Sequence, residues 1–302
     1  LLRKAKNTRW GEKYNYAEIR SEKIFQEEVP LQAYDDIRPF IDRLRNGEPN
    51  VLWPGEVKWF AKSSGTTSDK SKFIPVTKDA LEDCHLRGPR DVFAIYINNY
   101  PDTKVLTGKT LILGGSHQIN NMSNNSYYGD LSAILIENVP FWTDFIRTPP
   151  AEIALIEEFE EKIEQILKTS LDQNVTSLAG VPSWYLVLLK RVLEKTGKNN
   201  ILEVWPNLEV FIHGGVNFDP YREQYKKLIP SDQMHYMETY NASEGFFAIQ
   251  NNPASNDMML MLDYGVYYEF IPMEEFGTEN PKVLTLEEVE LNKNYALVIS
   301  TN

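Results

Sequence analysis

The sequence predicts an α/β protein in which helices cover a sheet on both faces. Between residues 57 and 230, short apolar runs alternate with longer segments in which apolar residues recur at helical spacing. After about residue 234 the pattern changes to successive strand-like segments, so the C-terminal third is expected to be rich in strands, as a separate sheet or barrel. At 302 residues, 42% of them hydrophobic, the chain could form one large domain or two small ones with a sizeable core.

The expected elements follow in order along the chain. Helices are expected at residues 31–44, about 78–98, 151–169 and 183–195, and from Asp219 to a point before Pro230. Strands are expected at residues 57–62, 73–77, 109–115, 175–181, 208–212, 234–238, 245–250, 258–262, 266–271 and 296–301. Thr77 precedes the second helix and is suited to cap it. The acidic run at residues 157–164 is interpreted as the solvated face of the helix at 151–169.

Charge and cysteine content exclude several function classes. The formal net charge is -12, which argues against nucleic acid or an anionic membrane surface as the main partner. No apolar run is long enough for a transmembrane helix. The single cysteine, Cys84, excludes an intramolecular disulfide and favours a reducing, cytoplasmic location.

A run of small hydroxylated residues lies between two expected strands. It reads Ser63-Ser64-Gly65-Thr66-Thr67 and is followed by Lys70 and Lys72. Glycine permits a tight turn, converging backbone N–H groups can bind anions, and the hydroxyls and lysines add donors and positive charge. The run therefore predicts a polyphosphate-binding loop. It lacks the Walker A pattern, and an ordinary serine- and glycine-rich turn is the alternative interpretation.

Two later turns carry further candidates. In Tyr240-Asn241-Ala242-Ser243-Glu244, the tyrosine ring offers a surface for a nucleobase, and Glu244 is a candidate ligand for Mg²⁺ beside a polyphosphate. Residues 263–272 join two expected strands through an Asp-Tyr-Gly turn. Each segment taken alone also fits an ordinary β-turn.

A polar segment, residues 116–128, follows the expected strand at 109–115. Open α/β sheets bind ligands just past the ends of their strands, so His117 is a candidate site residue there. A hydrogen-bonded structural histidine is the alternative.

The three motifs, in this order, resemble those of one family. Residues 63–67 with Lys70 and Lys72 resemble the phosphate loop of adenylate-forming enzymes, and residues 240–244 and 263–272 resemble their second and third ATP motifs. The spacing resembles the Gretchen Hagen branch, the auxin-responsive acyl-acid amido synthetases, in a bacterial-type member. Trp205-Pro206-Asn207-Leu208, leading to Gly214-Gly215, resembles the approach to the adenine in that family.

The resemblance implies a fold, an activity and roles for residues. The fold would be the large domain of an adenylate-forming enzyme, with mixed sheets flanked by helices. ATP and Mg²⁺ would activate a small carboxylic acid as an acyl-adenylate, and an amino acid would then form an amide. Ser63, Ser64, Gly65, Thr66, Thr67 and Lys72 would bind phosphates, and Glu244 the metal. Gly214, Gly215, Tyr240, Asn241, Ala242 and Ser243 would surround the adenine and α-phosphate, with His117 and Val181 near the acid.

Family members continue with a Gly-Asp pair that binds ribose and a small C-terminal domain with a catalytic lysine. Neither follows the third motif in this sequence, so residues 1–302 are expected to be the large N-terminal domain of a longer protein. Two alternatives remain open at this stage. The acceptor could be coenzyme A or a carrier thiol, or the chain could be a nucleotide-binding module without catalysis.

Overall fold

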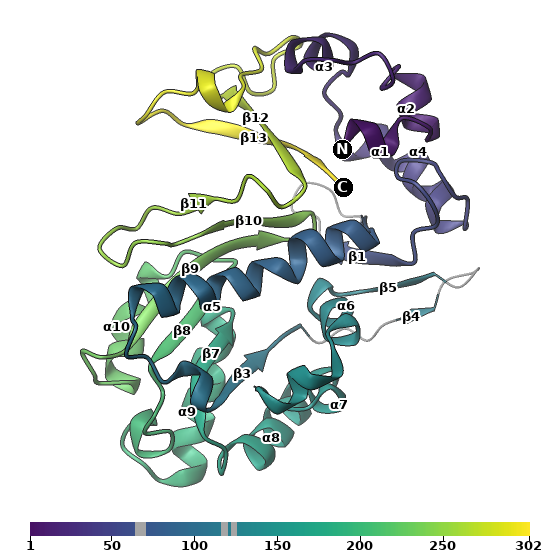
Figure 1. Cartoon of the computed structure of the whole chain (residues 1–302). Helices are drawn as coiled ribbons and strands as arrows, with labels where there is room; N and C mark the ends of the chain where they lie inside the picture. Colours follow the sequence, from purple (N-terminus) through teal and green to yellow (C-terminus); the bar gives the residue numbers. More distant parts are fainter. Residues whose placement is uncertain (64–70, 116–119, 122–125) are drawn as a thin grey trace. The chain divides into compact units, whose positions relative to one another are not determined.

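The computed structural model describes residues 1–63, 71–115, 120–121 and 126–302 (Figure 1). The chain divides into two compact units. Unit 1 consists of Leu1–Cys84, Asn121–Tyr127 and Leu262–Asn302, and unit 2 of His85–Asn120 and Tyr128–Met261. No helix in these described ranges is long and apolar enough to cross a membrane.

Unit 2 is built on a seven-stranded sheet with the order β11-β10-β9-β8-β7-β3-β6. Strands β6, β3, β7, β8 and β9 run parallel to one another, whereas β10 is antiparallel to both β9 and β11. Their bounds are β3 Lys109–Leu113, β6 Arg147–Thr148, β7 Val175–Gly180, β8 Val210–Gly214, β9 His235–Ala242, β10 Gly245–Ile249 and β11 Met259–Leu260.

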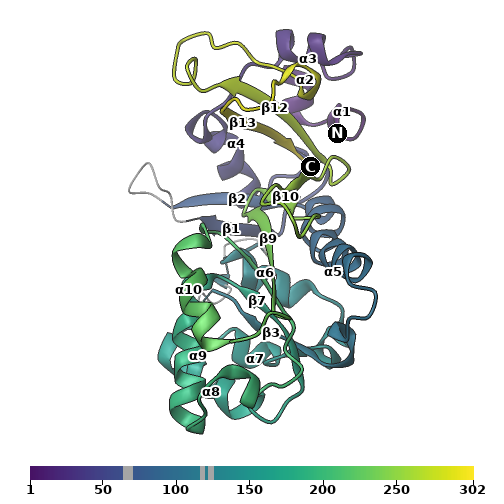
Figure 2. The same cartoon turned by 90° about the vertical axis from the view of Figure 1, so that its left-hand side faces the viewer.

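Helices cover both faces of this sheet, as the sequence predicts. Figure 2 shows α8 (Phe159–Ser170), α9 (Pro182–Thr196) and α10 (Asp219–Leu228) on one side and α5 (Arg87–Asn99) on the other. The first four residues of β7 are fully buried, because a parallel strand covered on both faces has no solvated side. The shorter elements of unit 2 are α6 Leu131–Asn138, α7 Ala151–Ala154 and 3-10 turns at Val105–Thr107, Phe141–Phe145 and Ile201–Glu203.

Unit 1 combines short helices with two antiparallel pairs of strands. Strands β1 (Trp59–Ser63) and β2 (Lys72–Val76) form a hairpin, and β12 (Val266–Pro272) pairs with β13 (Tyr295–Thr301). The helices of unit 1 are α1 Leu2–Ala5, α2 Arg9–Lys13, α3 Glu22–Glu28 and α4 Tyr34–Arg45, with a 3-10 turn at Leu286–Glu288. A π-helical segment, Ala80–His85, and the short strands β4 (Asn120–Asn121) and β5 (Tyr127–Gly129) fall where the chain passes from one unit to the other.

Several expected elements differ from those observed. The helix expected at 151–169 is two helices, α7 and α8, because the side chain of Glu158 accepts hydrogen bonds from the N–H groups of Glu160 and Glu161 and starts α8 anew. The helix expected at about 78–98 begins with the π-helical segment, although Thr77 does cap it: the Ala80 N–H donates to Thr77 Oγ1 at 2.9 Å.

The C-terminal third contains strands, as expected, but they do not all form a separate sheet. Strands β9, β10 and β11 extend the parallel sheet of unit 2, and only β12 and β13 pair apart from it. The reason lies in the register of β9, which pairs in parallel with β8 from His235 to Thr239. The expected strand at 258–262 is reduced to the two residues of β11.

Candidate functional site

The carboxyl ends of four parallel strands lie side by side in unit 2. Register pairs Leu113 of β3 with Gly180 of β7, Gly180 with His213 of β8, and Gly214 with Thr239 of β9. The turns after these strands therefore share one edge of the sheet, the edge at which open α/β sheets bind ligands. Among the site residues predicted in this unit, Val181 and Gly215 lie in the turns after β7 and β8, whereas Gly214 and residues 240–242 lie at the ends of β8 and β9.

The turn at Gly214-Gly215 packs tightly against β9. A side chain at Gly214 would collide with the carbonyl oxygen of Thr239, and its Cβ would lie 3.4 Å from Oδ1 of Asn241. Gly215 has a φ of +80°, which other residues rarely adopt. On its other side, the Cβ position of Gly215 lies 3.8 Å from Cγ2 of Val181. The structure thus brings together Val181, the glycine pair and Asn241, which are far apart in sequence.

Residues 240–244, the predicted second ATP motif, lie on a tight hairpin. Strand β9 continues through Ala242, so the turn consists of Ser243 and Glu244 alone rather than the longer polar turn expected from the sequence. Tyr240 is 45% exposed, and its ring packs edge-on against Phe247 with 5.1 Å between centroids. The exposed part of the ring can contact a planar ligand.

Glu244 has the properties that a metal-binding carboxylate needs. It is half-buried at the hairpin turn and makes no ion pair within the described part of the chain, so its oxygens are available to a cation. The described residues contain no cluster of three or more metal-binding side chains. This donor set suits Mg²⁺ bound by one carboxylate together with phosphate oxygens, and does not suit zinc in a protein cage.

His213 lies directly before the glycine turn and is buried. Its ring stacks on Phe218 with centroids 4.2 Å apart, and its carbonyl accepts a hydrogen bond of 3.2 Å from Thr239 Oγ1. Burial, assisted by the charge of Arg222, lowers the pKa of His213 to about 4. The side chain is therefore neutral near pH 7 and supports the turn as a packed ring.

A buried lysine that was not predicted from the sequence, Lys162, contacts the turn that follows β3. Lys162 of α8 is 1% exposed, and its Nζ donates to the carbonyl oxygen of Gly115 at 2.7 Å and lies 3.5 Å from that of Gly114. The acidic run around it was interpreted as a solvated face, and exposed pairs such as Glu160–Arg191 agree with that. Position 162 lies three residues after Phe159 and four before Ile166, a spacing that places it on the apolar face.

In unit 1, the β1–β2 hairpin fixes the two flanks of the predicted phosphate loop. Register pairs Ser63 with Lys72, and the ammonium of Lys72 lies 5.4 Å from the centroid of the Tyr34 ring. The Tyr34 hydroxyl accepts a hydrogen bond of 2.8 Å from the Phe73 N–H. Ser64, Gly65, Thr66 and Thr67 lie outside the described residues, as does His117.

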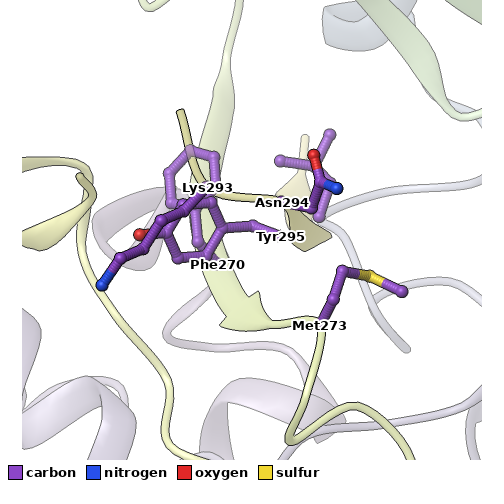
Figure 3. A pocket seen from close by; sticks show the side chains of 6 residues that line it. Phe270, Met273, Lys293, Asn294 and Tyr295 are labelled. Carbon is purple, nitrogen blue, oxygen red and sulfur yellow. The ribbon is translucent and has the colours of Figure 1, made fainter. Parts of the chain in front are cut away.

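A cavity of about 540 Å³ opens in unit 1 at the end of the β12–β13 pair (Figure 3). It is lined by Phe270, Met273, Lys293, Asn294, Tyr295 and Leu297. The ammonium of Lys293 is engaged by Glu290 at 2.8 Å. Phe270 belongs to the segment that resembles the third ATP motif, but none of the residues to which a role in binding ATP, Mg²⁺ or the acid was assigned lines this cavity.

The arrangement at the strand ends suits a nucleotide held by backbone and a free carboxylate, and comparison with known proteins supplies the family. Residues 1–234 match the GH3 family N-terminal domain, and residues 259–302 match the GH3 family central domain. The chain belongs to the GH3 family. This agrees with the resemblance that the three sequence motifs indicated.

Curated members of the GH3 family are similar over most of this chain. An indole-3-acetic acid-amido synthetase, GH3.3 of Arabidopsis thaliana, is 23% identical across the whole chain, which covers 60% of that protein. A 4-substituted benzoates-glutamate ligase, GH3.12 of the same plant, is 24% identical over 92% of the chain and 58% of its own length. The chain therefore spans about three fifths of the length of these relatives.

Solved structures show the same fold. The AtGH3.15 acyl acid amido synthetase in complex with 2,4-DB superposes with a TM-score of 0.80 at 18% identity, covering 100% of this GH3 chain and 60% of that one. A 2-hydroxyisobutyryl-CoA ligase reaches a TM-score of 0.50 at 10% identity over 86% of the chain. The predicted fold, that of the large domain of an adenylate-forming enzyme, is confirmed.

Proposed function

We propose that this chain is the ATP- and acid-binding part of an acyl-acid amido synthetase. One observation carries the proposal: in a GH3 family chain, the Gly214-Gly215 turn lies against β9, which leads directly to Tyr240 and Glu244. A backbone without side chains, an exposed aromatic ring and a free carboxylate at one sheet edge form a suitable set for a nucleotide and its metal.

The proposed reaction has two steps. In the first, a carboxylate oxygen of the acid attacks the α-phosphorus of ATP, the bond to the β-phosphate oxygen breaks, and pyrophosphate leaves. In the second, the amine of an amino acid attacks the acyl carbon, the bond to the AMP oxygen breaks, and a proton is lost from nitrogen as the amide forms. The protein contributes orientation and charge stabilisation rather than covalent chemistry.

Residues at different positions are assigned to different parts of the substrates. Tyr240, Asn241, Ala242 and Ser243, with Gly214 and Gly215, bind the adenine and the α-phosphate in this proposal. Glu244 holds Mg²⁺, which neutralises charge on the phosphates when it is bound. Ser63, Ser64, Gly65, Thr66, Thr67 and Lys72 bind the phosphates that leave as pyrophosphate. Val181, beside Gly215, and His117 lie on the side assigned to the acid.

The test is exchange of labelled pyrophosphate into ATP by the full-length protein, with a panel of aromatic and aliphatic carboxylic acids. The proposal expects exchange that requires both an acid and Mg²⁺. If ATP binds but no acid supports exchange, the proposal is wrong. Exchange followed by acyl transfer to coenzyme A alone, in an assay that offers thiol and amino acid acceptors together, would retain the adenylation step and reject the amide step.

A further inference from the structure

The buried lysine of unit 2 has no role in the reaction as proposed, and its position suggests one. Lys162 comes from α8, yet its ammonium reaches the backbone carbonyls of Gly114 and Gly115, the two residues that follow β3. With 1% of its surface exposed, it is among the largest fully buried side chains in the described part of the chain. An ion at such a site is costly unless its donors are satisfied.

Packing alone does not explain a lysine here. The neighbouring buried positions of α8 are Ile163, Ile166 and Leu167, and an apolar side chain at 162 would complete the same face without desolvating a charge. Replacing a buried ionic group by an apolar one of similar volume is often neutral or stabilising. The ammonium does something that an apolar side chain cannot do: it orients two consecutive carbonyl groups toward α8.

The same turn is fixed from a second direction by the start of α6. The Gly115 N–H donates to Ser132 Oγ at 2.9 Å, and a side chain at Gly115 would collide with the Asp130 carboxylate. Asp130 also lies close enough to Lys162 to favour its charged form, although burial is the larger influence and lowers the pKa of Lys162 to about 8. The turn is therefore fixed through both its N–H and its carbonyl groups.

The position of this turn relates it to the acid rather than to the nucleotide. The proposed nucleotide contacts lie after β8 and β9, whereas Gly114-Gly115 follows β3, which is separated from β8 by β7. A carboxylate that attacks the α-phosphate must approach from beside the nucleotide. On this edge of the sheet, the turns after β7 and β3 provide that side.

We infer that Lys162 is a positioning residue that fixes the Gly114-Gly115 turn as one wall of the acyl-acid site. This inference rests on the proposed function. Lys162 acts through the backbone of the turn, so its loss is expected to weaken use of the acid while leaving the nucleotide contacts after β8 and β9 in place.

The experiment compares Lys162→Met, Lys162→Arg and a matched control, Lys168→Met, which removes an exposed lysine from the same helix. Pyrophosphate exchange is measured in the full-length protein against acid and, separately, against ATP. Lys162→Met is expected to raise KM for the acid at least tenfold with KM for ATP changed less than twofold. Lys162→Arg, which retains a charged donor, is expected to recover part of the loss, and the control to behave as wild type.

An unchanged KM for the acid, or an equal rise in both KM values, would overturn the inference. If Lys162→Met fails to fold, Ser132→Ala tests the same turn, because it removes the hydroxyl bonded to Gly115 without disturbing a charge. It is expected to raise KM for the acid alone, and no change in that variant would also overturn the inference. If no acid supports pyrophosphate exchange by the wild-type protein, the proposed function itself is rejected.

Discussion

The two units carry candidate ATP-binding residues in different ways. In unit 2 the candidates lie on turns fixed by buried parallel strands, and the backbone supplies the binding surface: Gly214 lies against β9 with no room for a side chain. In unit 1 the two described candidates, Ser63 and Lys72, lie opposite each other on the β1–β2 hairpin and are proposed to act through their side chains. The comparison indicates that substitutions in unit 2 disturb geometry as well as binding, whereas those in unit 1 remove individual contacts.

The largest effect is expected at Glu244, the carboxylate that is proposed to bind Mg²⁺. Glu244→Ala is expected to lower the Mg²⁺-dependent exchange rate by about a thousandfold, near the upper range for loss of one electrostatic group in an active site. The melting temperature should stay within about 2 °C of wild type, because the side chain makes no ion pair in the described ranges. Glu152→Ala, on an exposed helix start, is the control. Full exchange activity in Glu244→Ala removes this residue from the metal role.

The next effect concerns the packed histidines of unit 2. Burial lowers the pKa of His213 and of His85 to about 4, from 6.5 when exposed. As pH falls below 6.5 the unfolded chain takes up protons before the folded chain does, so the free energy of unfolding falls between pH 6.5 and 4. Each histidine accounts for roughly 3 kcal/mol of that fall. Denaturant titrations across this pH window should show that the free energy of unfolding depends less steeply on pH in His213→Phe than in wild type. An equal dependence in the two proteins would contradict the lowered pKa of His213.

A smaller effect is expected in unit 2, where the backbone forms the proposed binding surface. Gly214→Ala places a methyl group against the Thr239 carbonyl, which is expected to destabilise the protein by about 2 kcal/mol and to raise KM for ATP. The control is Gly197→Ala at the end of α9, where the φ is +65° but no atom lies within 4 Å of the Cβ position. That variant should lose about 1 kcal/mol, the cost of a left-handed backbone for a residue with a Cβ, and keep its KM for ATP. Equal KM values in both variants would show that the turn after β8 does not contact the nucleotide.

The smallest effect tests the side-chain contacts of unit 1. Lys72→Met is expected to raise KM for ATP about tenfold, the loss of a single charge-assisted contact to phosphate, with little change in stability. Lys78→Met, a nearby exposed lysine, is the control. A loss of stability as large as that in Gly214→Ala would contradict the proposed difference between the two units.

Sequence alone was sufficient for the parts of the fold that depend on continuous apolar runs. Strand β3 ends with Leu111-Ile112-Leu113 and β8 begins with Val210-Phe211-Ile212, because a strand buried on both faces favours apolar side chains at successive positions. The length of β9 could not be read in this way. Thr239 and Asn241 are polar, and their strand conformation comes from backbone pairing with β8 and β10, which side-chain hydrophobicity does not reveal.

The sequence allowed the candidate site to be proposed residue by residue but not as an arrangement. The family resemblance indicated Gly214, Gly215 and Val181, yet their closeness to one another follows from parallel register, which is a tertiary property. Lys162 was missed for a related reason. Its neighbours in sequence are acidic and exposed, and only its place on the apolar face of α8 distinguishes it.

The most direct test of the central claim is product analysis with the full-length protein. The protein is incubated with ATP, Mg²⁺, an acid that supports pyrophosphate exchange, and a mixture of amino acids and coenzyme A. The account predicts that AMP and pyrophosphate form together with an acid–amino acid amide, all three being lost in Glu244→Ala. Formation of ADP and phosphate, or of an acyl thioester with no amide, would contradict it.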